Sequence, residues 1–383
     1  MNFSQIIKKS LRGIPLGSDV VKKWPKTRVK GCVAISYLTW PFRDGVNSPK
    51  MRGHTNAFEV SAMAESFLEL GYRVEICDYD NDHYKLPADC VVAIDIHGNL
   101  ERWHRKSKSP CHLILHASGT HWLQLNNAEL GRLESLRDRK GMALKPRRQA
   151  AVSNSVEYAK EIVVLGNEFT IKSWEFARRP ISRIPISSAY EFPWPKTRDF
   201  SNAKKRFLWV GSYGMVHKGL DLALDAFSGM PELELTVCGR PEKEDDFFQL
   251  YKKELTETPN IHFRGWMDMG SRAFSEITAT HATVIYPSCA EGGAGSVIHC
   301  MHAGMIPACT YEASVDLGNF GEVVEDGTVE AVQAACRKIA SLPDNEVESM
   351  ARASYEHART IHTRERFREN YRNYAASVIA GIK

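Results

Sequence analysis

An acid and three glycines stand together in the stretch Glu291-Gly-Gly-Ala-Gly-Ser-Val-Ile-His299, shortly after the apolar run ATVIYPS. We predict a strand, a glycine-rich turn and then a helix around residues 297–303. Bare backbone amides near a helix start favour an anion, and Glu291 can accept hydrogen bonds from hydroxyls attached to it. A sugar on a diphosphate carries both groups, whereas the alternative is a plain turn with a solvated glutamate. The residues predicted to bind such a sugar diphosphate, which we call the donor, are Gly292, Gly293, Ala294, Gly295 and Ser296.

A second glycine turn, Gly211-Ser-Tyr-Gly-Met-Val-His-Lys218-Gly219, lies between the apolar run RFLWVG and the helical pattern LDLALDAF. We predict that Gly211, Ser212, Tyr213 and Gly214 also bind the donor, with Lys218 as a mobile cation at its phosphates. The spacing is not that of a Walker loop, because Gly219 stands where Ser or Thr is required. An ordinary strand-to-helix turn is the alternative.

Histidines mark the corresponding strand end in the N-terminal half, where HLILHAS leads into His116-Ala-Ser-Gly-Thr-His121. A histidine at this position can bond a sugar hydroxyl or donate a proton near the anomeric centre. We therefore predict His116 as catalytic and His121 as acceptor-binding, and a buried histidine bonded to backbone is the alternative. His54, Thr55 and Asn56 precede a predicted helix from about residue 55 to 70 and form a predicted acceptor corner.

Several arginines follow in AELGRLESLRDRKGMALKPRRQ. A solvated helix face is expected for them, although one or two can meet an anionic acceptor. They are Arg132, Arg137, Arg139, Arg147 and Arg148.

These residues sit in two successive patterns of apolar strands alternating with amphipathic helices, which indicates an α/β fold with parallel sheets. The predicted strands are GCVAISYL, RVEICDY, CVVAIDIH, HLILHAS and EIVVLG in the first half, and RFLWVGS, LELTVCG, NIHFRG, ATVIYPS and MIPACTY in the second. A Pro- and Ser-rich linker separates the halves between residues 179 and 206. We predict a basic extension (1–30), an acceptor domain (31–190), a donor domain (191–363) and a final helix (364–383) that crosses back to the first domain.

The C-terminal half, over residues 205–345, resembles the donor domain of GT-B glycosyltransferases of the large retaining, family-four type, also described as glycosyl transferases group 1. Glu291 matches the first acid of their motif, Gly292 its glycine, Met301 its methionine and Gly304 its closing glycine. The resemblance implies two Rossmann-like, doubly wound domains facing a central cleft, with a nucleotide-sugar donor and a glycan or lipid-linked acceptor. It also implies retention of the anomeric configuration by same-face attack, without a protein nucleophile.

Two positions depart from that family pattern. His299 stands where a second acid holds the ribose hydroxyls, and a neutral imidazole cannot accept two strong charge-assisted bonds. The resemblance still places His299 near the nucleoside of the donor. The basic residue that often precedes the lysine is also absent, and Arg240 or His217 is the candidate to supply its charge.

The predicted function is therefore transfer of a sugar from a nucleotide diphosphate sugar to a hydroxyl acceptor, as in surface polysaccharide or glycoconjugate synthesis. One rival is a nucleotide-sugar epimerase on the same fold, and a second is a non-catalytic sugar-nucleotide or glycan-binding protein. No cofactor is expected besides the donor. No metal is expected either, because Cys300 is offset from the face that His299 and His302 would share, and no Asp-x-Asp motif is present.

The composition excludes several classes of protein. An apolar fraction of 43% with 25% charged residues is typical of a globular protein, and no apolar run approaches the roughly 20 residues of a membrane span. Nine cysteines without a Cys-x-x-Cys pair, and no apolar signal stretch at the start, predict a cytoplasmic protein. A net charge of +4 without an aromatic-interleaved basic stripe argues against nucleic acid as a partner.

The first 30 residues are strongly basic, with Asp19 as their one acid. Phe3, Ile6 and Leu11 fall near helical spacing beside the cations, so this segment can lie on anionic lipid. Peripheral contact with the inner face of a membrane is therefore one hypothesis. The alternative is an extension packed on its own domain with a solvated basic face.

Overall fold

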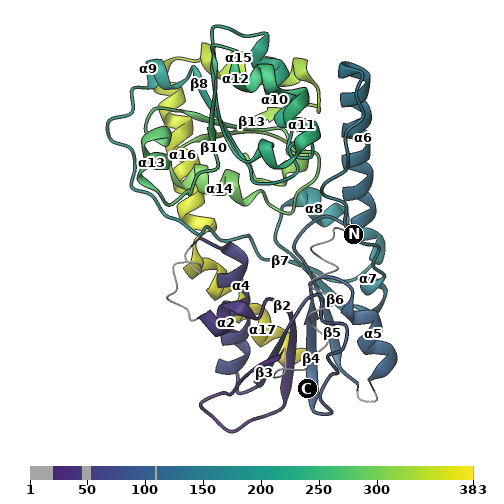
Figure 1. Cartoon of the computed structure of the whole chain (residues 1–383). Helices are drawn as coiled ribbons and strands as arrows, with labels where there is room; N and C mark the ends of the chain where they lie inside the picture. The colour runs from purple at the N-terminus through teal and green to yellow at the C-terminus, as the bar shows by residue number, and fades with distance from the viewer. Residues whose placement is uncertain (1–19, 45–52, 108–109, 383) are drawn as a thin grey trace.

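The computed structural model describes residues 20–44, 53–107 and 110–382, and it consists of two α/β domains (Figure 1). The first is built on a seven-stranded sheet of order β1-β3-β2-β4-β5-β6-β7, and the second on a six-stranded sheet of order β10-β9-β8-β11-β12-β13. Every neighbouring pair of strands is parallel except β1 and β3. Parallel strands end at one edge of a sheet, so the loops that follow them are gathered there.

The strands of the first sheet are β1 (Val20–Lys23), β2 (Cys32–Tyr37), β3 (Arg73–Asp78), β4 (Cys90–Asp95), β5 (His112–Ala117), β6 (Glu161–Val164) and β7 (Ile181–Arg183). The helices of this half are α2 (Trp40–Asp44), α4 (Thr55–Glu69), α5 (Asn99–Lys106), α6 (Trp122–Lys140), α7 (Ser155–Tyr158), α8 (Glu168–Lys172) and the 3-10 turn η1 (Glu175–Ala177). The predicted stripe of α4 is buried, since Val60, Ala64 and Phe67 are at most 1% exposed.

The second sheet contains β8 (Arg206–Val210), β9 (Glu234–Cys238), β10 (Ile261–Gly265), β11 (Thr283–Tyr286), β12 (Ile306–Thr310) and β13 (Glu322–Val324). Its helices and 3-10 turns are α9 (Phe200–Ala203), α10 (Leu220–Ser228), η2 (Pro241–Lys243), α11 (Asp245–Leu250), α12 (Lys252–Thr256), α13 (Arg272–Thr278), α14 (Gly295–His302), η3 (Tyr311–Ala313), α15 (Val329–Ser341) and α16 (Asp344–Ile361). All the strands predicted from the sequence are present in the two sheets. The structure adds β1, β7 and β13, which lie at sheet edges.

The last helix, α17 (Arg364–Gly381), leaves the second domain and packs against α4 of the first (Figure 1). Its inner face buries Phe367 and Tyr371, and Phe367 meets Phe58 of α4 edge to face at 6.3 Å between ring centroids. On the outer side, Arg372 pairs with Glu69 at 2.8 Å. The N-terminal domain therefore uses a helix from the far end of the chain to cover one face of its sheet.

Residues 20–23, within the predicted basic extension, form β1 and pair antiparallel with β3. Residues 1–19, which carry the predicted lipid-facing apolar residues, lie outside the described part of the chain. Among the helices of the described residues, none combines the length and the apolar character that a membrane crossing needs.

Helix α6 extends from the N-terminal domain along the side of the C-terminal domain (Figure 1). Arg139 pairs with Asp221 of α10 at 2.6 Å, and Lys140 pairs with Asp225 at the same distance. The chain then turns back along α6 through residues 141–154. The expectation of a solvated arginine face was therefore wrong for Arg139, because the acids of α10 lie opposite it.

Candidate active site

The acid and the cation singled out in the two glycine turns meet at the ends of β8 and β11. Lys218 donates to Glu291 Oε1 at 3.0 Å and to the hydroxyl of Tyr286 at 2.6 Å. The Tyr286 hydroxyl also donates to Glu291 Oε1, at 3.3 Å. Ser288 Oγ lies 3.2 Å from the same oxygen. Glu291 Oε1 is thus the centre of a compact polar cluster, which we call the Glu291 cluster.

Both charges of this pair persist at neutral pH. Burial alone would raise the pKa of Glu291, but the positive charges of Lys218 and Arg148 outweigh it and lower the pKa to about 2. Burial alone would lower the pKa of Lys218, yet the nearby carboxylate raises it. The cluster therefore presents a fixed carboxylate and a fixed ammonium, rather than a group poised to exchange protons.

The predicted anion site at Gly211–Gly214 is already filled by the protein itself. Glu244 accepts hydrogen bonds from the amides of Gly214 at 2.6 Å and Met215 at 3.2 Å, and the amide of Gly211 donates to the carbonyl of Cys238. The prediction that Gly211 and Gly214 offer their amides to phosphate was therefore wrong. Ser212 and Tyr213 remain exposed at the tip of the turn.

The turn after Glu291 is pressed against the N-terminal domain. A Cβ atom at Gly292 would lie 2.2 Å from the carbonyl oxygen of Ser118, so this close approach requires glycine. Gly293 adopts a positive φ of 95°. The amide of Ala294 donates to the carbonyl of Ala313, so the predicted row of four available amides is shorter than expected. Gly295 and Ser296 are partly exposed at the start of α14.

His299 lies on the buried side of α14, beneath the linker between the domains. Its Nε2 accepts a hydrogen bond from the amide of Ala189 at 2.9 Å, and its ring meets that of Tyr190. Burial lowers the pKa of His299 to about 3, so the ring is neutral. The acceptor nitrogen that would bond a ribose hydroxyl is occupied, and the expected nucleoside contact was therefore wrong.

His116 is fully buried between Tyr37 and Tyr371, with ring centroids 5.9 and 6.0 Å away. Its two ring nitrogens have no hydrogen-bond partner within the described residues. Burial lowers its pKa to about 4. The prediction of a catalytic histidine facing the cleft was therefore wrong, because α17 covers this strand end.

The candidate cations of the second domain also lie elsewhere. His217 is buried with its Nε2 2.6 Å from the carbonyl of Ala290, and burial lowers its pKa. Arg240 is exposed and stacks over Trp266 at 4.7 Å from the ring centroid. Neither one replaces the missing basic residue beside Lys218 in this structure.

The predicted acceptor residues fall in two places. His54, Thr55 and Asn56 begin α4, and neighbouring Gly53 approaches the hydroxyl of Tyr190 in the linker. His121 instead caps α6 and accepts from the amide of Leu123. The structure therefore does not bring the four residues together.

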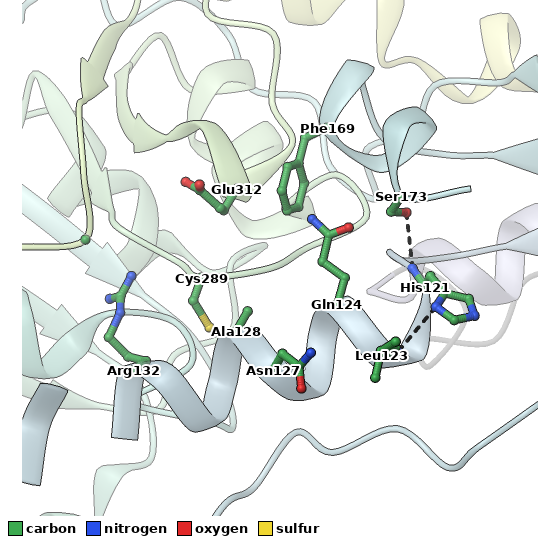
Figure 2. Close-up of a pocket in the computed structure, with 11 residues that line it drawn as sticks. His121, Leu123, Gln124, Asn127, Ala128, Arg132, Phe169, Ser173, Cys289 and Glu312 are labelled. Atoms are coloured by element: carbon green, nitrogen blue, oxygen red, sulfur yellow. Dashed lines mark hydrogen bonds between the residues drawn. The ribbon is translucent and has the colours of Figure 1, made fainter. Parts of the chain in front are cut away.

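His121 lines a groove of about 680 Å³ between α6 and the loops after β11 and β12 (Figure 2). Gln124 and Asn127 project from α6, with Gln124 directed toward Phe169, and Glu312 lines the groove from the C-terminal domain. The groove adjoins the Glu291 cluster because Cys289 lines it and the carbonyl of Glu312 accepts the Glu291 amide. It offers amides, a carboxylate and an aromatic edge next to the fixed charges.

Comparison with known protein families gives a match in the second domain of the chain. Residues 204–353 match the family model described as "Glycosyl transferases group 1". A comparison of the sequence with curated proteins found no match.

Solved structures share the architecture of most of the chain at low sequence identity. Sucrose-phosphate synthase from Thermosynechococcus elongatus has a TM-score of 0.60 at 11% identity, over 91% of this chain and 99% of that one. HepE from Anabaena, in complex with UDP and glucose, has a TM-score of 0.55 at 10% identity, over 91% and 100%. A TarM variant from S. aureus, with UDP, has 0.51 at 13%, over 74% of this chain and 55% of that one. This chain thus spans about half of TarM, and the predicted GT-B fold is confirmed.

Three contributors to the site were not assigned to it from the sequence. Tyr286 and Ser288 lie in the same strand end as Glu291, so their proximity was readable from spacing. Arg148 lies 3.9 Å from Glu291 Oε2 but comes from the other domain, and no local pattern indicates that contact.

We predict that the stability supplied by the Glu291 cluster depends on acid pH. Because the pKa of Glu291 is lowered from 4.5 to about 2, its contribution is present above pH 4.5 and is lost as the pH falls toward 2. Near neutral pH, Glu291→Gln should destabilise the C-terminal domain by about 3–5 kcal/mol, because it leaves Lys218 buried without its partner. Urea unfolding of both proteins from pH 6 to pH 2.5 should show the difference shrinking. A difference that stays constant would contradict the assigned charge state.

Proposed function

We propose that the protein uses Lys218 and Glu291 to transfer a sugar from a nucleoside diphosphate sugar to a hydroxyl group of an acceptor. The observation that carries this proposal is the fixed ammonium–carboxylate pair at the ends of β8 and β11, 3.0 Å apart. Lys218 would offset the negative charge that grows on the leaving diphosphate. Glu291, ionised at all physiological pH values, would accept hydrogen bonds from the sugar hydroxyls and orient the ring.

The proposal includes retention of the anomeric configuration and a reaction without a metal. Retention follows from the resemblance to the family-four enzymes, in which the acceptor attacks from the face that the diphosphate leaves. Charge stabilisation would come from preorganised side chains. Within the described residues, no group of three His, Cys, Asp or Glu side chains is placed to hold a metal ion.

Substitution of the two charged residues tests the proposed transfer. Lys218→Ala and Glu291→Ala should each lower kcat by about 100- to 1,000-fold, because each removes an interaction that the transition state strengthens. Lys196→Ala, an exposed lysine of the linker, is the matched control and should keep full activity. The assay measures transfer from UDP- and GDP-sugars to a panel of glycans, after a thermal-shift screen of nucleoside diphosphates has identified the base.

Three results would contradict this proposal. Unchanged turnover in both variants would show that the Glu291 cluster is not the site. Conversion of a nucleotide sugar to its epimer, without any acceptor, would favour the epimerase instead. Nucleotide-sugar binding by the wild-type protein without turnover would favour the non-catalytic rival.

The acceptor in this proposal is a glycan that enters the groove beside α6. Planar amides, a carboxylate and an aromatic edge suit sugar hydroxyls and the apolar face of a sugar ring, and Gln124, Asn127, Glu312 and Phe169 supply them. His121 lies at the far end of the same groove. A glycan carried on a lipid presents the same sugar groups to these residues and fits the proposal equally.

Substitution of Gln124 and Asn127 by Ala tests the acceptor groove. Each variant should raise the acceptor KM about 3- to 10-fold, since each loses a hydrogen bond of about 1 kcal/mol. Hydrolysis of the donor sugar by water, measured without acceptor, should stay unchanged because the donor contacts are intact. Glu134→Gln, on the exposed side of α6, serves as the control. An unchanged acceptor KM in both groove variants would place the acceptor elsewhere.

We further propose that the enzyme acts in the cytoplasm and touches the anionic inner face of a membrane through residues 1–30. Support comes from the described part of this segment, where Trp24 is 59% exposed and Val29 is 44% exposed among exposed cations. These cations are Lys22, Lys26, Arg28 and Lys30. Exposed aromatic and basic side chains together favour the interface of an anionic bilayer.

Charge reversal tests the membrane contact. Lys26→Glu combined with Arg28→Glu should weaken sedimentation with vesicles that contain phosphatidylserine, because each cation near such a surface contributes about 1 kcal/mol. Binding to vesicles of phosphatidylcholine alone should be weak for both proteins. Equal sedimentation of the variant and the wild type with the anionic vesicles would rule out this contact.

A further inference from the structure

The glycine turn before α10 leaves little backbone for a diphosphate. The amides of Gly214 and Met215 already donate to the Glu244 carboxylate, and a phosphate cannot use donors that bond a buried acid. Lys218 supplies one positive charge, but it is also bonded to Glu291 and Tyr286. A donor diphosphate bound here therefore needs a further cation from a side chain.

Arg148 lies over this same turn. Its aliphatic part covers Gly214, where an added Cβ atom would lie 2.4 Å from Arg148 Cγ. Its guanidinium nitrogen is 3.9 Å from Glu291 Oε2, which is within ion-pair range but too long for a direct hydrogen bond. The side chain keeps 37% of its surface exposed, and it makes no side-chain hydrogen bond within the described residues. Its donors are therefore available to a ligand.

The backbone that carries Arg148 is held firmly from the N-terminal domain. Glu129 of α6 accepts hydrogen bonds from the amides of Arg147 at 2.9 Å and Arg148 at 2.7 Å. Arg147 itself pairs with Asp246 of the C-terminal domain at 2.5 Å. Arg148 is thus held over the Gly211–Gly219 turn by Glu129 of the N-terminal domain. Its neighbour Arg147 fixes the same backbone to the C-terminal domain through Asp246.

We propose that Arg148 binds the β-phosphate of the donor, opposite Lys218, and so replaces the basic residue that the donor turn lacks. This inference rests on the proposed function. Glu291 orients the sugar, the β-phosphate is the group attached to that sugar, and Arg148 lies next to Glu291. A guanidinium stays charged at every relevant pH and can make two parallel bonds to phosphate oxygens. Because Arg148 belongs to the N-terminal domain, the phosphate site is complete only when the two domains meet.

Nucleotide binding separates this role from a structural one. Isothermal titration of the wild-type protein with UDP, GDP, ADP and dTDP, and with the matching monophosphates, identifies the base and measures both affinities. Arg148→Ala should weaken binding of the diphosphate about 10- to 100-fold, as loss of a charge-assisted contact does. Binding of the monophosphate should stay nearly unchanged, because it lacks the β-phosphate. Arg148→Lys should recover part of the diphosphate affinity.

The control is Arg137→Ala, which removes an exposed arginine of α6 whose side chain pairs with its neighbour Asp138. It should bind both nucleotides like the wild type. If Arg148→Ala binds the diphosphate normally, the inference is wrong and the proposed function stands on Lys218 and Glu291. Equal losses for monophosphate and diphosphate in both Arg148 variants would show a general disturbance of the site and would also overturn the inference. Failure of the wild type to bind any of the diphosphates would overturn it together with the proposed function.

Discussion

The carboxylate of Glu291 is the constraint on which the candidate site depends. Its side chain is only 10% exposed, and a buried carboxylate is stable only beside positive charge or several donors. Lys218 from the β8 turn and the hydroxyls of Tyr286 and Ser288 meet this need within the C-terminal domain. Arg148 adds charge from the other domain. The same carboxylate therefore organises a potential reaction centre to which both domains contribute a positive charge.

Much of the fold could be predicted because its signal is local. Central strands such as β5 and β11 are short apolar runs followed by turn residues, and α4 carries an unbroken buried stripe. The edge strands β1, β7 and β13 were missed since they have only three or four residues and pair on one side. A short edge strand can be polar, so periodicity does not mark it.

The candidate site could be predicted only for residues that closely follow a predicted strand. Glu291 and Lys218 each follow an apolar run, and two parallel strands place those ends together. His116 and His299 were both predicted to face the cleft, yet α17 and the linker cover them. A histidine looks the same in sequence whether it faces a cleft or a helix. The contacts of Glu244 with the Gly211–Gly219 turn and of Arg148 with Glu291 could not be predicted, because these partners lie far apart in the sequence.

Helix α17 has a consequence for how the protein is made. The N-terminal domain emerges from the ribosome before the C-terminal domain, but Phe367 and Tyr371 in its core are translated after both sheets. One face of its sheet therefore stays incompletely covered until the C-terminal domain and α17 have been synthesised. The C-terminal domain, whose strands and covering helices are contiguous in sequence, has all of its own core available earlier. The half that begins the chain is thus the last to be finished, and α17 docking onto α4 is the step that completes it.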